Sequence, residues 1–170
     1  MDTRLVRELR ILLPPGDQDD LTEGATTDPA ELRYRQVGAL DWSRLRLDGA
    51  AVAGCRFSGT TLRDSVWEKS TISGARFEQV DLSSARLQEI KLDRTRFTGC
   101  QLSGMVLTEA SMSNVIFENC RLDYATFHAV RTTGPVAFVD CTLTEANLTA
   151  CRWTEVVFDS CRPIWRSEER

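Results

Sequence analysis

The chain has 170 residues, a formal net charge of -4, 42% hydrophobic residues and six cysteines, which is typical of one soluble globular domain. Because no apolar run approaches the ~18 residues of a membrane helix and the start lacks a signal-peptide core, we expect a cytoplasmic protein without membrane contacts. Reducing conditions argue against disulfides, no C-x-x-C pair suggests a metal site, and the single histidine, His128, leaves little for acid–base catalysis. We therefore expect no enzyme, metal or cofactor.

Residues 1–36 differ in composition from the rest of the chain. They hold eight acids and five arginines, so they carry -3 of the net charge, while residues 37–170 carry only -1. Five apolar residues share one helical stripe that ends at Pro14-Pro15, which predicts a short helix from Met1 to Leu13 that lies over or beside the first coil. These residues are Leu5, Val6, Leu9, Leu12 and Leu13. A first strand at Arg10 to Leu13 fits nearly as well, and Gly16 to Pro29 is expected to be a loop.

From residue 37 onward, a large residue stands at every fifth position, and 24 of 25 such centres are apolar. The centres are Val37, Trp42, Leu47, Val52, Phe57, Leu62, Trp67, Ile72, Phe77, Leu82, Leu87, Leu92, Phe97, Leu102, Leu107, Met112, Phe117, Leu122, Phe127, Thr132, Phe138, Leu143, Leu148, Trp153 and Phe158. The register slips by one residue after Thr132, where Gly134-Pro135 predicts a bulge or tight corner. A fixed period of five indicates a repeat architecture.

A second column of mostly small residues lies two positions before the centres, and all six cysteines fall in it. They are Cys55, Cys100, Cys120, Cys141, Cys151 and Cys161. In extended chain both columns face the same side, so we interpret these cysteines as small core residues. Because five is an odd number, the chain must turn once per repeat to keep both columns inside. The pattern therefore predicts a coil.

The phenylalanines give the number of sides of this coil. Six of the seven are spaced by 20, 20, 20, 21 and 20 residues, so four repeats make one turn and like residues stack on successive coils. About six coils at ~4.8 Å per strand give a rod about 30 Å long.

The C-terminal end of the repeat carries an apolar segment, Pro163-Ile164-Trp165, ahead of the polar tail 166–170. A repeat rod exposes an open edge at each end. Two interpretations stay open. These residues form an apolar cap, or, together with Phe158, they form a homodimer seam in which two rods meet end to end.

Charged residues on the side that carries the phenylalanines suggest a partner-binding surface. Arginines precede three successive phenylalanines, and acids follow the later ones, so this side is basic toward its start and acidic toward its end. The residues are Arg56, Arg76, Arg96, Glu118, Asp140 and Asp159. The pI of about 5.1 and the lack of aromatic residues among the basic ones argue against direct nucleic-acid binding.

The repeat resembles the pentapeptide-repeat proteins, whose unit is a small residue, Asp or Asn, Leu or Phe, and two variable residues. Ala146-Asn147-Leu148-Thr149-Ala150 matches it fully, and Val80-Asp81-Leu82-Ser83-Ser84 nearly so. The resemblance covers about residues 37–165 and implies an all-β fold, a right-handed quadrilateral parallel β-helix of about six coils. Residues 1–36 would then be an N-terminal cap or loop and 166–170 a tail.

The resemblance also implies a function. The best understood members are non-enzymatic, rod-like homodimers that resemble B-form DNA and occupy the DNA-binding surface of DNA gyrase or topoisomerase IV, which they inhibit or protect from quinolones. We therefore expect a DNA-mimic-like modulator of these enzymes that dimerises through its C-terminal end. The alternative is a scaffold for an unrelated protein partner.

Overall fold

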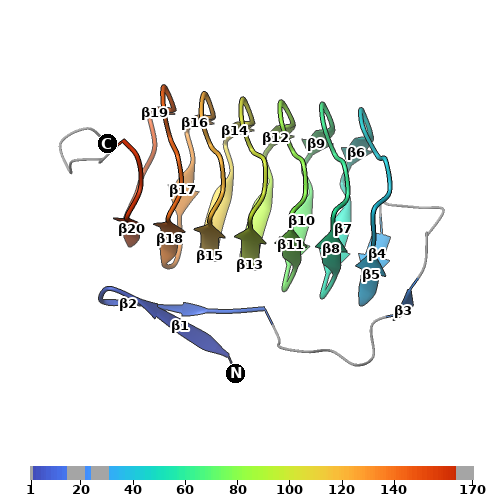
Figure 1. Ribbon diagram of the computed structural model, residues 1–170, viewed down its shortest axis with the longest axis horizontal. Helices are drawn as coiled ribbons and strands as arrows, with labels where there is room; N and C mark the ends of the chain where they lie inside the picture. The colour runs from blue at the N-terminus through green and yellow to red at the C-terminus, as the bar shows by residue number, and fades with distance from the viewer. Residues whose placement is uncertain (1, 15–21, 24–30, 164–170) are drawn as a thin grey trace.

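The computed structural model describes residues 2–14, 22–23 and 31–163, and in these ranges the chain forms a parallel β-solenoid of about six turns (Figure 1). Strands are the only regular elements of the described residues. No helix among them could cross a membrane. The predicted all-β coil is confirmed.

The solenoid has four sides, which we name by their centres. The Phe side is built from β3 (Thr22–Glu23), β5 (Arg35–Val37), β8 (Arg56–Ser58), β11 (Arg76–Glu78), the second halves of β13 (Lys91–Thr98) and β15 (Ser111–Glu118), β18 (Val136–Val139) and β20 (Val156–Asp159). Before it in each coil comes the Ile72 side, with β4 (Glu31–Arg33), β7 (Ala51–Ala53), β10 (Thr71–Ser73), the first halves of β13 and β15, and β17 (Arg131–Thr132).

The other two sides complete each coil. The Leu107 side is a separate six-stranded parallel sheet of β6 (Arg46–Asp48), β9 (Val66–Glu68), β12 (Arg86–Gln88), β14 (Val106–Thr108), β16 (Thr126–His128) and β19 (Asn147–Thr149). The Leu82 side is joined only by isolated parallel bridges such as Asp81↔Gln101. From β4 onward, register partners are 20 residues apart, as in Phe77↔Phe97, or 21 apart where the pairing spans the extra residue, as in Phe117↔Phe138.

The core is made of the two predicted inward columns. Phenylalanine rings 57, 77, 97, 117, 138 and 158 stack with centroids 4.7–4.8 Å apart and nearly parallel planes. All six cysteines are free, and five are buried. The thiols of Cys100, Cys120 and Cys141 each donate to the carbonyl of a phenylalanine in the preceding coil at 3.3–3.4 Å. The cysteines are therefore core residues, as their spacing predicts.

The corners explain how an odd period is accommodated. In almost every repeat the residue two positions after the centre has a positive φ, whether it is a glycine such as Gly49 or a larger residue such as Lys69 or Glu89. This left-handed residue turns the chain and restores the inward direction of the next centre.

Two boundaries differ from the sequence prediction. The regular five-residue repeat begins with β4 at Glu31 and not at residue 37, because Leu32 is a buried centre one repeat earlier and β4 pairs with β7. Thr22–Glu23, inside the predicted loop, forms β3 and pairs with Arg35 and Gln36.

The one polar centre, Thr132, is buried, and its hydroxyl lies 3.0 Å from that of Thr154.

The predicted N-terminal helix is wrong. β1 (Thr3–Val6) and β2 (Leu9–Leu12) form an antiparallel hairpin, which we call the N-terminal hairpin. It runs along the outside of the Phe side, beneath β13 to β20 in Figure 1, and does not cap the first coil. An extended hairpin is favoured over a helix because Val6, Ile11 and Leu13, which share one face of the extended chain, pack against an apolar surface there.

Candidate protein-binding surface

An apolar strip on the outside of the solenoid lies under the N-terminal hairpin. We call it the outer strip, and it consists of Ile116, Ala137, Val139 and Val157. These residues flank the inward centres Phe117, Phe138 and Phe158, so their side chains point to the opposite face of the strands. Ile116 and Ala137 are fully buried because the hairpin covers them.

Polar contacts surround this apolar centre. Arg4 donates to Glu118, which also accepts from Arg96 at 3.0 Å. Arg7 lies 3.4 Å from Asp159, and the Leu12 amide donates to Asn114 Oδ1 at 3.0 Å. An apolar centre with a charged rim is the usual anatomy of a protein–protein interface.

The structure brings together some of the charged residues that the sequence singled out. Glu118 and Asp159 pair with Arg4 and Arg7 of the N-terminal hairpin. Arg76 donates to the carbonyl of Pro14, just after the hairpin, at 3.3 Å, and Arg96 is linked to the hairpin through Glu118. Arg56 lies apart from it and pairs with Glu78 of the next coil at 2.9 Å.

Asp140 is exposed at a corner. Cross-coil ion pairs thus offset part of the predicted change from basic to acidic along this side.

The proposed dimer seam is only partly described. Phe158 is half-buried and stacks on Phe138, and Pro163 is exposed. Ile164 and Trp165 lie outside the described residues, as does the tail 166–170. The C-terminal homodimer stays a prediction.

The pKa of Glu118 reports on the hairpin contact. Burial on its own would raise that pKa, but the hydrogen bond and charge of Arg4, together with those of Arg96, outweigh burial and hold the pKa below its usual range. A depressed carboxyl pKa stabilises the docked state above the usual value of about 4.3, and this contribution is lost as the pH falls through the depressed value.

We therefore expect acid to weaken docking of the N-terminal hairpin. Methyl signals of Val6 and Ile11 in NMR spectra should shift toward those of an undocked hairpin as the pH falls from about 5 through the depressed pKa of Glu118. Glu118→Gln is the control, because it cannot titrate. It should dock more weakly at neutral pH and show less change over the same range. An unchanged acid transition in Glu118→Gln would contradict this assignment.

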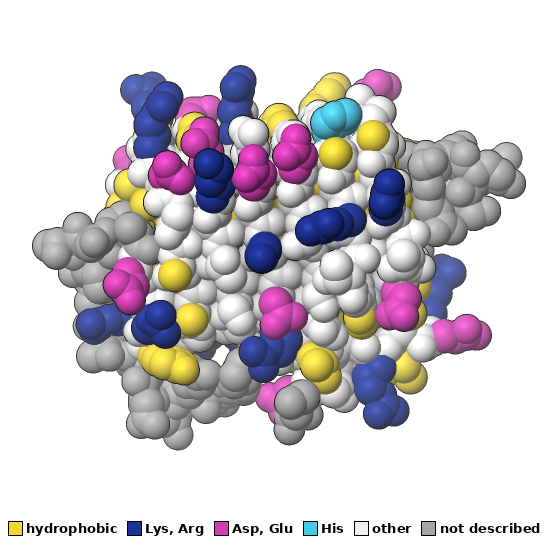
Figure 2. Space-filling view, turned by 180° about the vertical axis from the view of Figure 1, so that it is seen from behind, with side chains coloured by type: hydrophobic (Ala, Val, Ile, Leu, Met, Phe, Trp, Pro, Cys, Tyr) yellow, Lys and Arg dark blue, Asp and Glu magenta, His cyan; other side chains and the backbone are white. Residues whose placement is uncertain are grey.

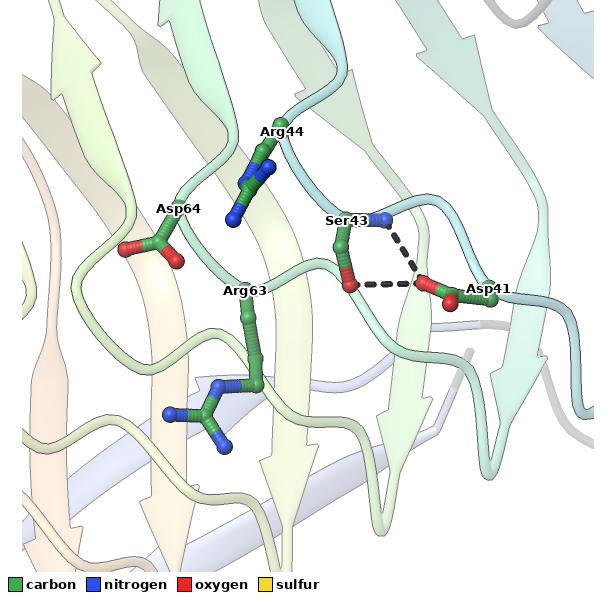
Figure 3. A pocket seen from close by; sticks show the side chains of 5 residues that line it. All are labelled: Asp41, Ser43, Arg44, Arg63 and Asp64. Carbon is green, nitrogen blue, oxygen red and sulfur yellow. Dashed lines mark hydrogen bonds between the residues drawn. The ribbon is translucent and has the colours of Figure 1, made fainter.

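A shallow pocket lies near the start of the rod, between the Leu82 and Leu107 sides. It is lined by Asp41, Ser43, Arg44, Arg63 and Asp64 (Figure 3). Asp41 accepts hydrogen bonds from the Ser43 hydroxyl at 2.6 Å and the Ser43 amide at 3.0 Å, which lower the pKa of Asp41. Its lining mixes charges of both signs. Among the described residues no cluster of His, Cys, Asp and Glu has the arrangement of a metal site.

Comparison with known proteins agrees with this geometry. Residues 70–135 match the family model described as pentapeptide repeat region. This part of the chain is therefore similar to a pentapeptide repeat region. The matched residues include the coil in which the outer strip begins, at Ile116. No curated protein matches the chain.

Solved structures of pentapeptide-repeat proteins are also similar. Full-length QnrB1, a plasmid-mediated fluoroquinolone resistance protein, is 16% identical, with 73% of this chain and 84% of that chain covered and a TM-score of 0.45. Rfr23 from the cyanobacterium Cyanothece 51142 is 18% identical over 77% and 89%, with a TM-score of 0.31. HetL from Nostoc sp. strain PCC 7120, involved in heterocyst differentiation regulation, is 12% identical over 77% and 88%, with a TM-score of 0.17.

Proposed function

We propose that this protein is a non-enzymatic binding protein that docks a protein partner along its rod, and that DNA gyrase or topoisomerase IV is that partner. The observation that supports it is a row of acids at one edge of the rod, between the Leu107 and Ile72 sides. Asp48, Glu68, Glu89 and Glu109 are all exposed and stand on four successive coils. Figure 2 shows acidic side chains gathered along its upper edge, beside the histidine.

Such a row offers negative charge at regular steps, which is what a surface built to hold DNA phosphates attracts. Residues 37–170 carry only -1 in total, so any mimicry of DNA is confined to this row and does not extend around the rod. Lys69 interrupts the row between Glu68 and Glu89. The row therefore orients the rod on a basic surface more than it strengthens binding.

Charge reversal of the row tests this function. The triple variant Glu68→Lys, Glu89→Lys and Glu109→Lys should lose binding to purified gyrase and topoisomerase IV by about tenfold or more at low salt. It should also lose any effect on gyrase supercoiling, measured with and without a fluoroquinolone. The matched control, Asp64→Lys, Glu145→Lys and Glu155→Lys, changes the net charge equally at other exposed positions and should retain binding.

A wild-type chain that neither binds these enzymes nor alters supercoiling would overturn the gyrase proposal. The second candidate, a scaffold for an unrelated protein partner, is favoured by a different observation. This is the apolar outer strip with its charged rim, which already holds a folded segment.

A further inference from the structure

The N-terminal hairpin has two chemically different faces. Its register pairs Arg4 with Ile11 and Val6 with Leu9, so these four side chains share one face. Val6 and Ile11 are buried against the outer strip, whereas Leu5 on the opposite face is 67% exposed. The hairpin thus presents alternate aliphatic residues and one arginine to the solenoid.

The hairpin packs on the surface of the solenoid and does not pair with its strands. Its two strands form a sheet of their own, with no ladder to either solenoid sheet. The contacts with the solenoid are apolar packing, ion pairs, and hydrogen bonds that each involve a side chain, such as Leu12 to Asn114 and Arg76 to Pro14. The phenylalanine stack is completed on the inner side of the strands. The core of the solenoid therefore does not depend on this cover.

Two buried polar atoms beside the hairpin have no hydrogen-bond partner among the described residues. They are the Nε atoms of Arg76 and Arg96. Leaving a buried donor unpaired opposes docking. An occupant that offered acceptors to these two atoms would fit the same surface better than the N-terminal hairpin does.

We propose that the outer strip is an exchangeable docking surface, which a partner protein occupies by displacing the N-terminal hairpin. The partner segment is extended, with aliphatic side chains at alternate positions facing the strip and a basic residue facing Glu118. The rim argues for this chemistry, because displacement of Arg4 and Arg7 would expose Glu118 and Asp159 to the incoming segment. The proposal goes beyond the gyrase hypothesis and does not rest on the acidic row.

The hairpin in the same chain competes with any external segment. Because the hairpin is part of the same chain, it binds the strip intramolecularly and keeps it covered until a segment that binds better arrives. The strip is thereby protected from nonspecific association, which an exposed apolar patch would invite.

The test uses the full-length chain with the hairpin undocked, so that the outer strip is exposed. We call this variant the opened chain. Ile11→Asp places a charge on the buried face of the hairpin and should undock it. The probe is a fluorescent peptide of residues 1–14, which has the chemistry that the strip recognises. We expect the Ile11→Asp chain to bind this peptide about tenfold or more tightly than the wild type does, measured by fluorescence anisotropy. Adding Val139→Asp should abolish that binding.

Exchanging the charges of Glu118 and Arg4 tests whether the peptide binds in the same position as the hairpin, and it leaves the apolar residues of the outer strip unchanged. Glu118→Arg in the opened chain should weaken binding of the peptide, and a peptide carrying Arg4→Glu should recover it. The proposal is overturned if the opened chain binds no more tightly than the wild type, or if the charge exchange restores nothing. Sedimentation that showed the opened chain forming dimers through the strip would assign the surface to a second copy, and would also overturn it.

Discussion

Phe97→Ala is expected to lower the free energy of unfolding by about 3–5 kcal/mol. Phe97 stacks on both sides, against Phe77 and Phe117, with ring centroids 4.8 Å away in each direction. It is buried in the middle of the rod, where the regular register leaves neighbouring coils little freedom to close the cavity. Urea denaturation followed by circular dichroism measures the change.

The matched control is the same substitution at Phe158, toward the C-terminal end of the described stack. Phe158 is half-buried and stacks on Phe138. Since cavity cost depends on burial, Phe158→Ala should cost less than half as much as Phe97→Ala. Equal losses at the two positions would show that the stack does not carry the stability we assign to it.

Most of the solenoid could be predicted from the sequence because each coil repeats the same local rule. A centre such as Phe77 and the small residue two positions before it both face inward, so a period of five read from the sequence fixes the inside and the outside. The corners were harder to predict, because larger residues such as Lys69 and Glu89 adopt the left-handed conformation as well as glycines. There the geometry of the coil overrides the local preference of the residue.

The sequence does not reveal the first repeat, and it predicts only the second strand of the hairpin, at Arg10 to Leu13, as an alternative to a helix. Leu32 continues the period of five toward the N-terminus. One further repeat before Val37 is too weak a pattern to be recognised next to a segment without repeats. In the hairpin, Val6 and Leu9 fit a helical stripe as well as they fit a two-stranded turn. The choice between these depends on the outer strip, more than 100 residues away, and local sequence does not contain that information.

The outer strip itself left a signal in the sequence. Positions next to the centres are mostly polar along the rod, yet Ile116, Ala137, Val139 and Val157 are apolar on three successive coils. Such a break in the outward pattern predicts that something covers the surface. It does not indicate what does so, since the covering segment is identified only by its contacts in the folded chain.

Two adjacent residues of β15 test whether the solenoid core and the outer strip contribute separately to stability. Ile116 and Phe117 are adjacent in sequence and are both fully buried, but Phe117 lies in the solenoid core and Ile116 lies under the hairpin. Phe117→Asp should leave the chain without a cooperative unfolding transition. It creates a cavity worth about 3–5 kcal/mol and buries a charge, against a typical total stability of 5–15 kcal/mol.

Ile116→Asp, in contrast, should release the N-terminal hairpin and leave the solenoid folded, because undocking gives the new carboxylate access to water. Circular dichroism melts should then keep the main transition, with its free energy within about 1–2 kcal/mol of the wild type. Hydrogen exchange of the β1 and β2 amides should lose its protection. If Ile116→Asp abolished the main transition as Phe117→Asp does, the cover would be part of the core and the hairpin could not be exchanged.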